Sequence, residues 1–168
     1  MKYNITMEEY KQENLIDEEQ ATLSTVMEVV SMKQIIQETP KNYDSHMVSS
    51  THAGNIGIRE IGDEASECVL VLCLSTKNKI NAMHKVFAGS LNTSVAHPRE
   101  IFRTAIMNNA ARIILYHNHP SGDTEPSEAD HSFTRRLAES GDMLGIELLD
   151  HFVVTNDEYL SFREHNYL

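Results

Sequence analysis

The chain has 168 residues, of which 40% are hydrophobic and 23% charged, values that are typical of a soluble globular protein. Its formal net charge of -11 disfavours tight binding to duplex nucleic acid, because such binding relies on lysine and arginine side chains that neutralise phosphates. No apolar run approaches the ~20 residues that span a bilayer, and the acidic N-terminus lacks the apolar core of a signal peptide. We therefore expect a cytoplasmic protein that does not bind membranes.

The first part of the chain differs in composition from the rest. Residues 1–45 carry nine acidic residues and four lysines, and we assign them to an acidic N-terminal extension. Within this extension, the β-branched and apolar run at 25–36 (TVMEVVSMKQII) predicts an edge strand. Residues 46–168 form a single predicted domain.

Strand and helix patterns are mixed along this second part. Short apolar runs bounded by turns predict strands, and apolar residues at helical spacing predict helices. Helices are expected at 49–62, 97–110 and 127–145, and strands at 67–75, 80–91, 112–119, 146–155 and 159–162. This mixture predicts an α/β fold in which a mixed β-sheet is flanked by helices.

Capping and turn residues refine the ends of these elements. Ser49 or Ser50 is expected to cap the first helix, and Gly141 or Gly145 can end the third. Gly122 is expected to adopt a positive φ in the loop between strand 112–119 and helix 127–145.

The two cysteines, Cys68 and Cys73, lie in one predicted strand. Their odd separation places them on opposite faces, so they cannot form a disulfide with each other. Buried free thiols are the simpler interpretation, and they suit a reducing compartment.

Two histidines, His117 and His119, lie at the end of the apolar run at 112–119. Side chains at positions i and i+2 of a strand project to the same face, so both imidazoles can reach one metal ion. Asp130 lies eleven positions after His119, one turn into the next predicted helix, and the Gly/Pro-rich loop between them can return that helix to the strand end. Two imidazoles and one carboxylate are typical ligands of a catalytic zinc ion, which activates water for hydrolysis.

Structural roles for the same residue types stay open at this point. An isolated histidine is more often a packing residue than a ligand, and we expect this of His97, His131 and His151. Ser127 and Asp130 also fit a helix N-cap with an acid three residues later, and this capping role is compatible with a ligand role. TIM-barrel hydrolases use a His-x-His pair as well, but their barrel takes ~250 residues, which this chain does not have.

The complete spacing is His117, one residue, His119, seven residues, Ser127, two residues and Asp130. It resembles the JAMM motif of the JAB1/MPN metalloprotease family. The flanking stretches GSLNTSVAHPREIFRTAIMNNAARIILYHNHPSGDTEPSEAD, LLDHFVV and YLSF are similar to the bacterial RadC-like branch of that family. The resemblance covers roughly 46–168 and implies an MPN domain with a cytidine-deaminase-like fold.

The resemblance implies a role for each residue of the motif. His117, His119 and Asp130 match the residues that bind Zn²⁺ in the family. Ser127 matches the serine beside the metal, which helps to stabilise the oxyanion formed when water attacks an amide carbonyl.

The family also uses a glutamate from an earlier strand, which orients the water and transfers its proton. Glu67 is the best match to this position. The family pattern continues with two glycines, where this chain has Leu70 and Leu74, and Glu64 and Glu100 stay as alternatives. Glu100 lies at a predicted helix start, where a capping role is expected.

The resemblance thus implies a zinc-dependent peptidase or isopeptidase that acts on a peptide or protein substrate. The alternatives are a non-catalytic RadC-like module associated with DNA repair or recombination, and a metal-bound adaptor between proteins. Asp150 and His151 also match the family, but the sequence assigns them no role.

Overall fold

A computed structural model describes residues 29, 31–41, 43–88 and 97–168. The chain divides into two units, Met1–Gln37 and Glu38–Leu168. Every helix and strand assigned among the described residues belongs to the second unit, which begins before residue 46. They are α2 (Ser50–Gly57), the π-helix η1 (Ile58–Gly62), β1 (Cys68–Leu74), β2 (Ile80–Ala88), α3 (Pro98–Met107), β3 (Arg112–Asn118), α4 (Glu128–Leu144), β4 (Glu147–Val154) and β5 (Tyr159–Ser161).

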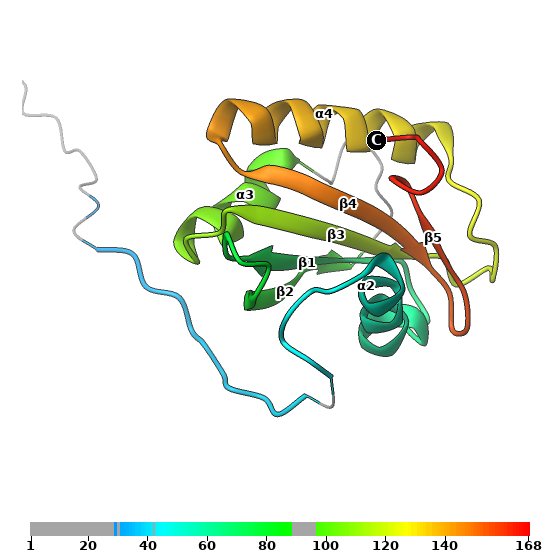
Figure 1. Cartoon of the computed structure of the whole chain (residues 1–168), viewed down its shortest axis with the longest axis horizontal. Helices are drawn as coiled ribbons and strands as arrows, with labels where there is room; N and C mark the ends of the chain where they lie inside the picture. Colours follow the sequence, from blue (N-terminus) through cyan, green and yellow to red (C-terminus); the bar gives the residue numbers. More distant parts are fainter. Residues whose placement is uncertain (1–28, 30, 42, 89–96) are drawn as a thin grey trace, which may run out of the picture. The chain divides into compact units, whose positions relative to one another are not determined.

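The five strands form one sheet in the order β2-β1-β3-β4-β5 (Figure 1). Strand β3 is parallel to β4, and the other three pairs are antiparallel. The parallel pair follows from its connection, because α4 lies between β3 and β4 in the chain and returns it to the starting edge. The predicted α/β class with a mixed sheet is therefore confirmed.

Helices cover both faces of this sheet, with α3 and α4 on one side and α2 on the other (Figure 1). The alternation of side chains along the buried strands supplies a core to each face. The core under α3 and α4 contains Val69, Val71, Cys73, Ile113, Leu115, Ile101, Phe102, Phe133 and Leu137. The core under α2 contains Cys68, Leu70, Leu72, Ile114, Tyr116, Phe152, Ala53 and Ile56. Cys68 and Cys73 are free and lie in different cores, as predicted.

The edge strand predicted at 25–36 is wrong for the part of the segment that the structure describes. Residues 29 and 31–36 form no strand, while residues 25–28 and 30 lie outside the described residues. The apolar side chains of Val29, Met32, Ile35 and Ile36 are exposed. A β-branched run forms a strand only where a neighbouring strand pairs with it and a core covers it, and this segment has neither among the described residues.

The helix ends agree with the capping predictions. Ser49 caps α2, and its side chain accepts a hydrogen bond from the His52 N–H. Gly145 ends α4 with a φ of 67°, and Gly122 has a φ of 82° in the loop before α4. Within the described part of the chain, no helix is long and apolar enough to cross a bilayer.

Candidate metal centre

The end of β3 brings two histidines to the same side of the sheet. His117 pairs with Val69 of β1, and both belong to the face covered by α3 and α4. His119 follows β3 directly, and its N–H donates to the Val154 carbonyl at 2.9 Å, which holds it beside the end of β4.

Asn118, between the two histidines, points to the opposite face, as the strand alternation predicts. Its Oδ1 accepts from the Cys68 N–H at 2.7 Å, and its Nδ2 donates to the Glu64 carbonyl at 3.0 Å. Asn118 therefore ties the segment that precedes β1 to the end of β3.

The third residue comes from the start of α4. Ser127 is the N-cap, and its Oγ accepts from the Asp130 N–H at 3.3 Å. The Asp130 Oδ2 in turn accepts from the Ser127 N–H at 2.8 Å and from the Ser127 hydroxyl at 2.6 Å. The predicted capping box is present, and it orients the Asp130 carboxylate toward the two histidines.

The three side chains converge. The Nε2 atoms of His117 and His119 lie 3.0 Å apart, and Asp130 oxygens lie 3.3 Å from the first and 3.8 Å from the second. Ligand atoms around a tetrahedral zinc ion, with bonds of about 2.0–2.2 Å, lie about 3.3–3.6 Å from one another. The observed spacing fits such an ion, and the ligand atoms all fall within 4.8 Å of one another.

Neighbouring groups also set the chemical state of these ligands. The Nδ1 of His119 lies 2.7 Å from the Asp123 carbonyl, which can only accept, so His119 donates its Nδ1–H and presents a bare Nε2. A second-sphere carbonyl of this kind is common for metal-binding histidines.

Burial and neighbouring groups together set the charge of the other two ligands. Burial lowers the pKa of His117, and the adjacent Asp130 carboxylate only partly opposes this. Burial acts to raise the pKa of Asp130, but the adjacent His117 and the hydrogen bonds from Ser127 outweigh it and hold that pKa well below its usual range. A neutral imidazole and an ionised carboxylate are the forms that bind a metal.

Glu67 directly precedes β1. Because Val69 pairs with His117 and side chains two apart share a face, Glu67 lies on the face of the two histidines. The Glu67 charge also acts to raise the pKa of His117, against the larger lowering effect of burial. This placement keeps Glu67 as the candidate proton-transfer residue.

The two alternative glutamates are engaged elsewhere. Glu64 is exposed, and its carboxylate forms an ion pair with Lys85 of β2. Glu100 lies in the first turn of α3 and pairs with Arg103 at 2.7 Å and Arg99 at 3.4 Å. The Glu100 carboxylate therefore binds these arginines and does not take the expected capping role.

A groove of about 380 Å³ opens beside His119. It is lined by Gly62, Asp63 and Glu64 from the end of η1, by Pro120 and Gly122 from the loop after β3, and by Asn156. The candidate metal site therefore borders an open depression.

The sequence did not indicate the part that His151 plays. His151, expected to be a packing residue, is fully buried, and its Nε2 lies 2.9 Å from the Nδ1 of His117. Only the pairing of β3 with β4, which aligns Leu115 with His151, brings His151 close to His117. Local sequence patterns do not predict this pairing.

The fold and site together define an α/β domain with a two-histidine, one-carboxylate metal-site candidate at one end of its sheet. Comparison with known proteins agrees with this class. The family model described as a RadC-like JAB domain matches residues 47–167. The chain therefore belongs to the RadC-like JAB domain family, as its motif suggested.

Three similar proteins are each named UPF0758 protein. The one from Chlorobaculum parvum is 53% identical over 108 residues, which cover 64% of this chain and 49% of that protein. The one from Enterococcus faecalis is 39% identical over 163 residues, covering 89% and 70% respectively. The one from Latilactobacillus sakei is 43% identical over 122 residues, covering 73% and 54%. The chain thus spans about half the length of the first and third relatives, and their names state no activity.

Proposed function

We propose that this chain is a zinc-dependent hydrolase that cleaves a peptide or isopeptide bond. The observation that carries the proposal is the convergence of His117, His119 and Asp130 within 4.8 Å, next to the groove beside His119. A set of three protein ligands leaves one position for water, as in catalytic rather than structural zinc sites. Membership of the RadC-like JAB domain family supports the same reading.

His117, His119 and Asp130 would hold the ion. When bound, zinc lowers the pKa of a coordinated water toward ~7 and polarises a substrate carbonyl. Glu67 would accept the proton of the attacking water on its carboxylate and return it to the leaving amine. Its position on the face of the histidines, just before β1, suits this transfer.

Ser127 would donate a hydrogen bond to the oxyanion. Its hydroxyl now donates to Asp130 at 2.6 Å, so this role requires the hydroxyl to rotate toward the substrate. The Ser127 N–H would continue to bind Asp130 and keep the carboxylate in place.

Hydrolysis tests the proposal directly. A library of peptides and of isopeptide-linked lysine peptides would be incubated with the zinc-loaded chain, and cleavage products identified by mass spectrometry. We expect cleavage that a chelator abolishes and zinc restores. Asp130→Ala should be inactive, whereas the control Glu128→Ala, at an exposed position of the same helix turn, should be active.

A zinc-loaded chain that cleaves no member of the library would contradict the proposal and favour a non-catalytic module or a metal-bound adaptor.

We further propose that the protein acts in the cytoplasm, because free buried Cys68 and Cys73 suit a reducing compartment.

A further inference from the structure

A continuous row of buried hydrogen-bonding groups runs from the backbone of α4 to the candidate metal site. The Thr134 hydroxyl donates to the Asp130 carbonyl at 2.7 Å and also lies 2.6 Å from the Nδ1 of His151. The Nε2 of His151 lies 2.9 Å from the Nδ1 of His117. The Nε2 of His117 then faces His119 and Asp130.

The Asp130 carbonyl at the start of this row determines which group donates and which accepts in each of its hydrogen bonds. A carbonyl only accepts, so the single hydroxyl hydrogen of Thr134 is directed at Asp130. The short contact between Thr134 and His151 must then be made by the Nδ1–H of His151, which donates to the Thr134 oxygen.

The direction passes through both rings. A neutral imidazole carries one N–H, on one ring nitrogen, and a lone pair on the other, and the 2.9 Å contact between the two rings pairs a donor with an acceptor. With its hydrogen on Nδ1, His151 offers a bare Nε2 that accepts the Nδ1–H of His117. His117 is left with its lone pair on Nε2, at the point where the three candidate ligands converge.

The opposite direction would block the site. If His151 carried its hydrogen on Nε2, His117 would accept it on Nδ1 and place its own N–H between His119 and Asp130. A protonated Nε2 cannot bind a metal. Asp130 does not need that hydrogen bond, because its Oδ2 already accepts two from Ser127.

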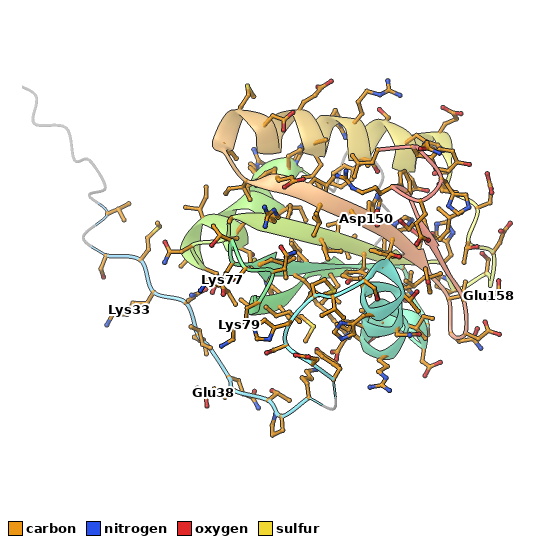
Figure 2. All side chains as sticks on the ribbon, in the orientation of Figure 1. Lys33, Glu38, Lys77, Lys79, Asp150 and Glu158 are labelled. Carbon is orange, nitrogen blue, oxygen red and sulfur yellow. The ribbon has the colours of Figure 1, made fainter. Side chains whose placement is uncertain are left out.

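The surroundings hold His151 in place. Its ring stacks on Phe162, with centroids 4.6 Å apart and an interplanar angle of 24°, and its carbonyl accepts from the Phe162 N–H at 2.9 Å. Asp150, labelled on β4 in Figure 2, secures the same segment from the other side of the strand. Its carboxylate accepts from the Ser161 hydroxyl at 2.6 Å and the Arg163 N–H at 3.1 Å.

We propose that Thr134 and His151 are positioning residues that fix the Nδ1–H tautomer of His117 and so prepare its Nε2 for metal binding. The inference rests on the zinc site of the proposed function, but not on hydrolysis. It gives the Asp150–His151 pair a role: Asp150 anchors the segment whose Phe162 packs on His151.

The wild-type chain gives the first test. Long-range ¹H–¹⁵N spectra of metal-free protein labelled on its histidine nitrogens, at pH 8, distinguish protonated from bare ring nitrogens. We expect His117 and His151 to carry their hydrogens on Nδ1. A majority of His117 with the hydrogen on Nε2 would overturn the proposal without need of any variant.

Paired variants give the second test. Thr134→Val keeps the shape but removes the hydroxyl, so His151 loses the acceptor for its Nδ1–H and the reverse direction becomes favourable. We expect the dissociation constant for Zn²⁺, measured by chelator competition, to rise about 10–100-fold, as for other outer-sphere partners of metal ligands. The tautomer of His117 should shift toward Nε2–H in the same protein, which a merely structural defect would not produce.

Matched controls separate this effect from general damage. Thr134→Ser retains the hydroxyl and should bind zinc as the wild type does. Thr104→Val removes a second threonine hydroxyl that contacts a histidine, since Thr104 Oγ1 lies 2.8 Å from the Nδ1 of His84, and it should leave zinc affinity unchanged. Equal zinc affinity in Thr134→Val and wild type would overturn the proposal, as would an equal loss in Thr104→Val.

The two proposals can fail separately. A wild-type chain that binds zinc with the expected tautomers but cleaves nothing would contradict the hydrolase and leave the positioning role standing. Zinc-dependent hydrolysis by a chain whose metal-free His117 carries its hydrogen on Nε2 would support the hydrolase and contradict the positioning role.

Discussion

Ser127 and Asp130 hold each other through reciprocal hydrogen bonds at the start of α4. The Ser127 Oγ accepts from the Asp130 N–H at 3.3 Å, while the Asp130 carboxylate accepts from the Ser127 N–H at 2.8 Å and hydroxyl at 2.6 Å. The same carboxylate thus caps a helix and faces His117 and His119. Helix formation and metal-site formation are therefore coupled through one side chain.

This coupling predicts that Ser127→Ala destabilises the metal-free chain. Loss of an N-cap side chain costs about 0.5–2 kcal/mol of folding free energy. Urea unfolding would measure it, with Ser127→Thr as a control that retains the cap. If the midpoint for Ser127→Ala equals that of the wild type, the capping bond contributes nothing to stability.

Glu67→Gln should bind zinc with wild-type affinity and lose nearly all hydrolysis. Glutamine keeps the size and hydrogen bonding of the side chain but cannot take the proton, and general acid–base groups contribute ~10²–10⁴-fold to rate. Turnover of any substrate found in the library would be compared with that of Glu64→Gln, whose carboxylate is bound to Lys85. Full activity in Glu67→Gln together with inactivity in Glu64→Gln would transfer the role to Glu64.

Gly62→Ala should destabilise the fold at the edge of the groove. A Cβ at this position would lie 2.4 Å from the Thr155 carbonyl oxygen, a backbone atom that cannot move aside alone. Overpacking of this kind costs about 1–3 kcal/mol. The neighbouring exposed substitution Asp63→Ala should change the unfolding free energy by less than about 0.5 kcal/mol. Equal stabilities of the two variants would show that the η1 end shifts freely.

Duplex DNA should not bind tightly to this chain. Its net charge of -11 gives no excess of cations to neutralise phosphates. Fluorescence anisotropy with a labelled duplex at physiological salt should show no nanomolar complex. A tight complex that weakens as salt rises would instead favour the non-catalytic module associated with DNA repair.

Local patterns were sufficient where the determinants are local. The strand period brought His117 and His119 to one face, and the cap pattern located Ser127 and Asp130 at the start of α4. The role of His151 could not be predicted, because it lies 34 residues from His117 in the chain and meets it only through the parallel pairing of β3 and β4.

At 25–36, by contrast, local patterns predicted a strand that the described residues do not form. The β-branched residues of this run have strand propensity, but propensity alone does not supply a pairing partner, and none of residues 29 and 31–36 is in a strand. Tertiary contacts decide both the role of His151 and the conformation of 25–36, and the local patterns of a single sequence do not predict such contacts.

Metal analysis of the purified chain tests the central claim most directly. After loading with zinc and removal of the excess, the wild type should retain about one zinc ion per chain. His117→Ala and Asp130→Ala should retain almost none, whereas His84→Ala, a histidine on β2 outside the site, should retain as much as the wild type. Wild-type zinc content in both His117→Ala and Asp130→Ala would contradict the account.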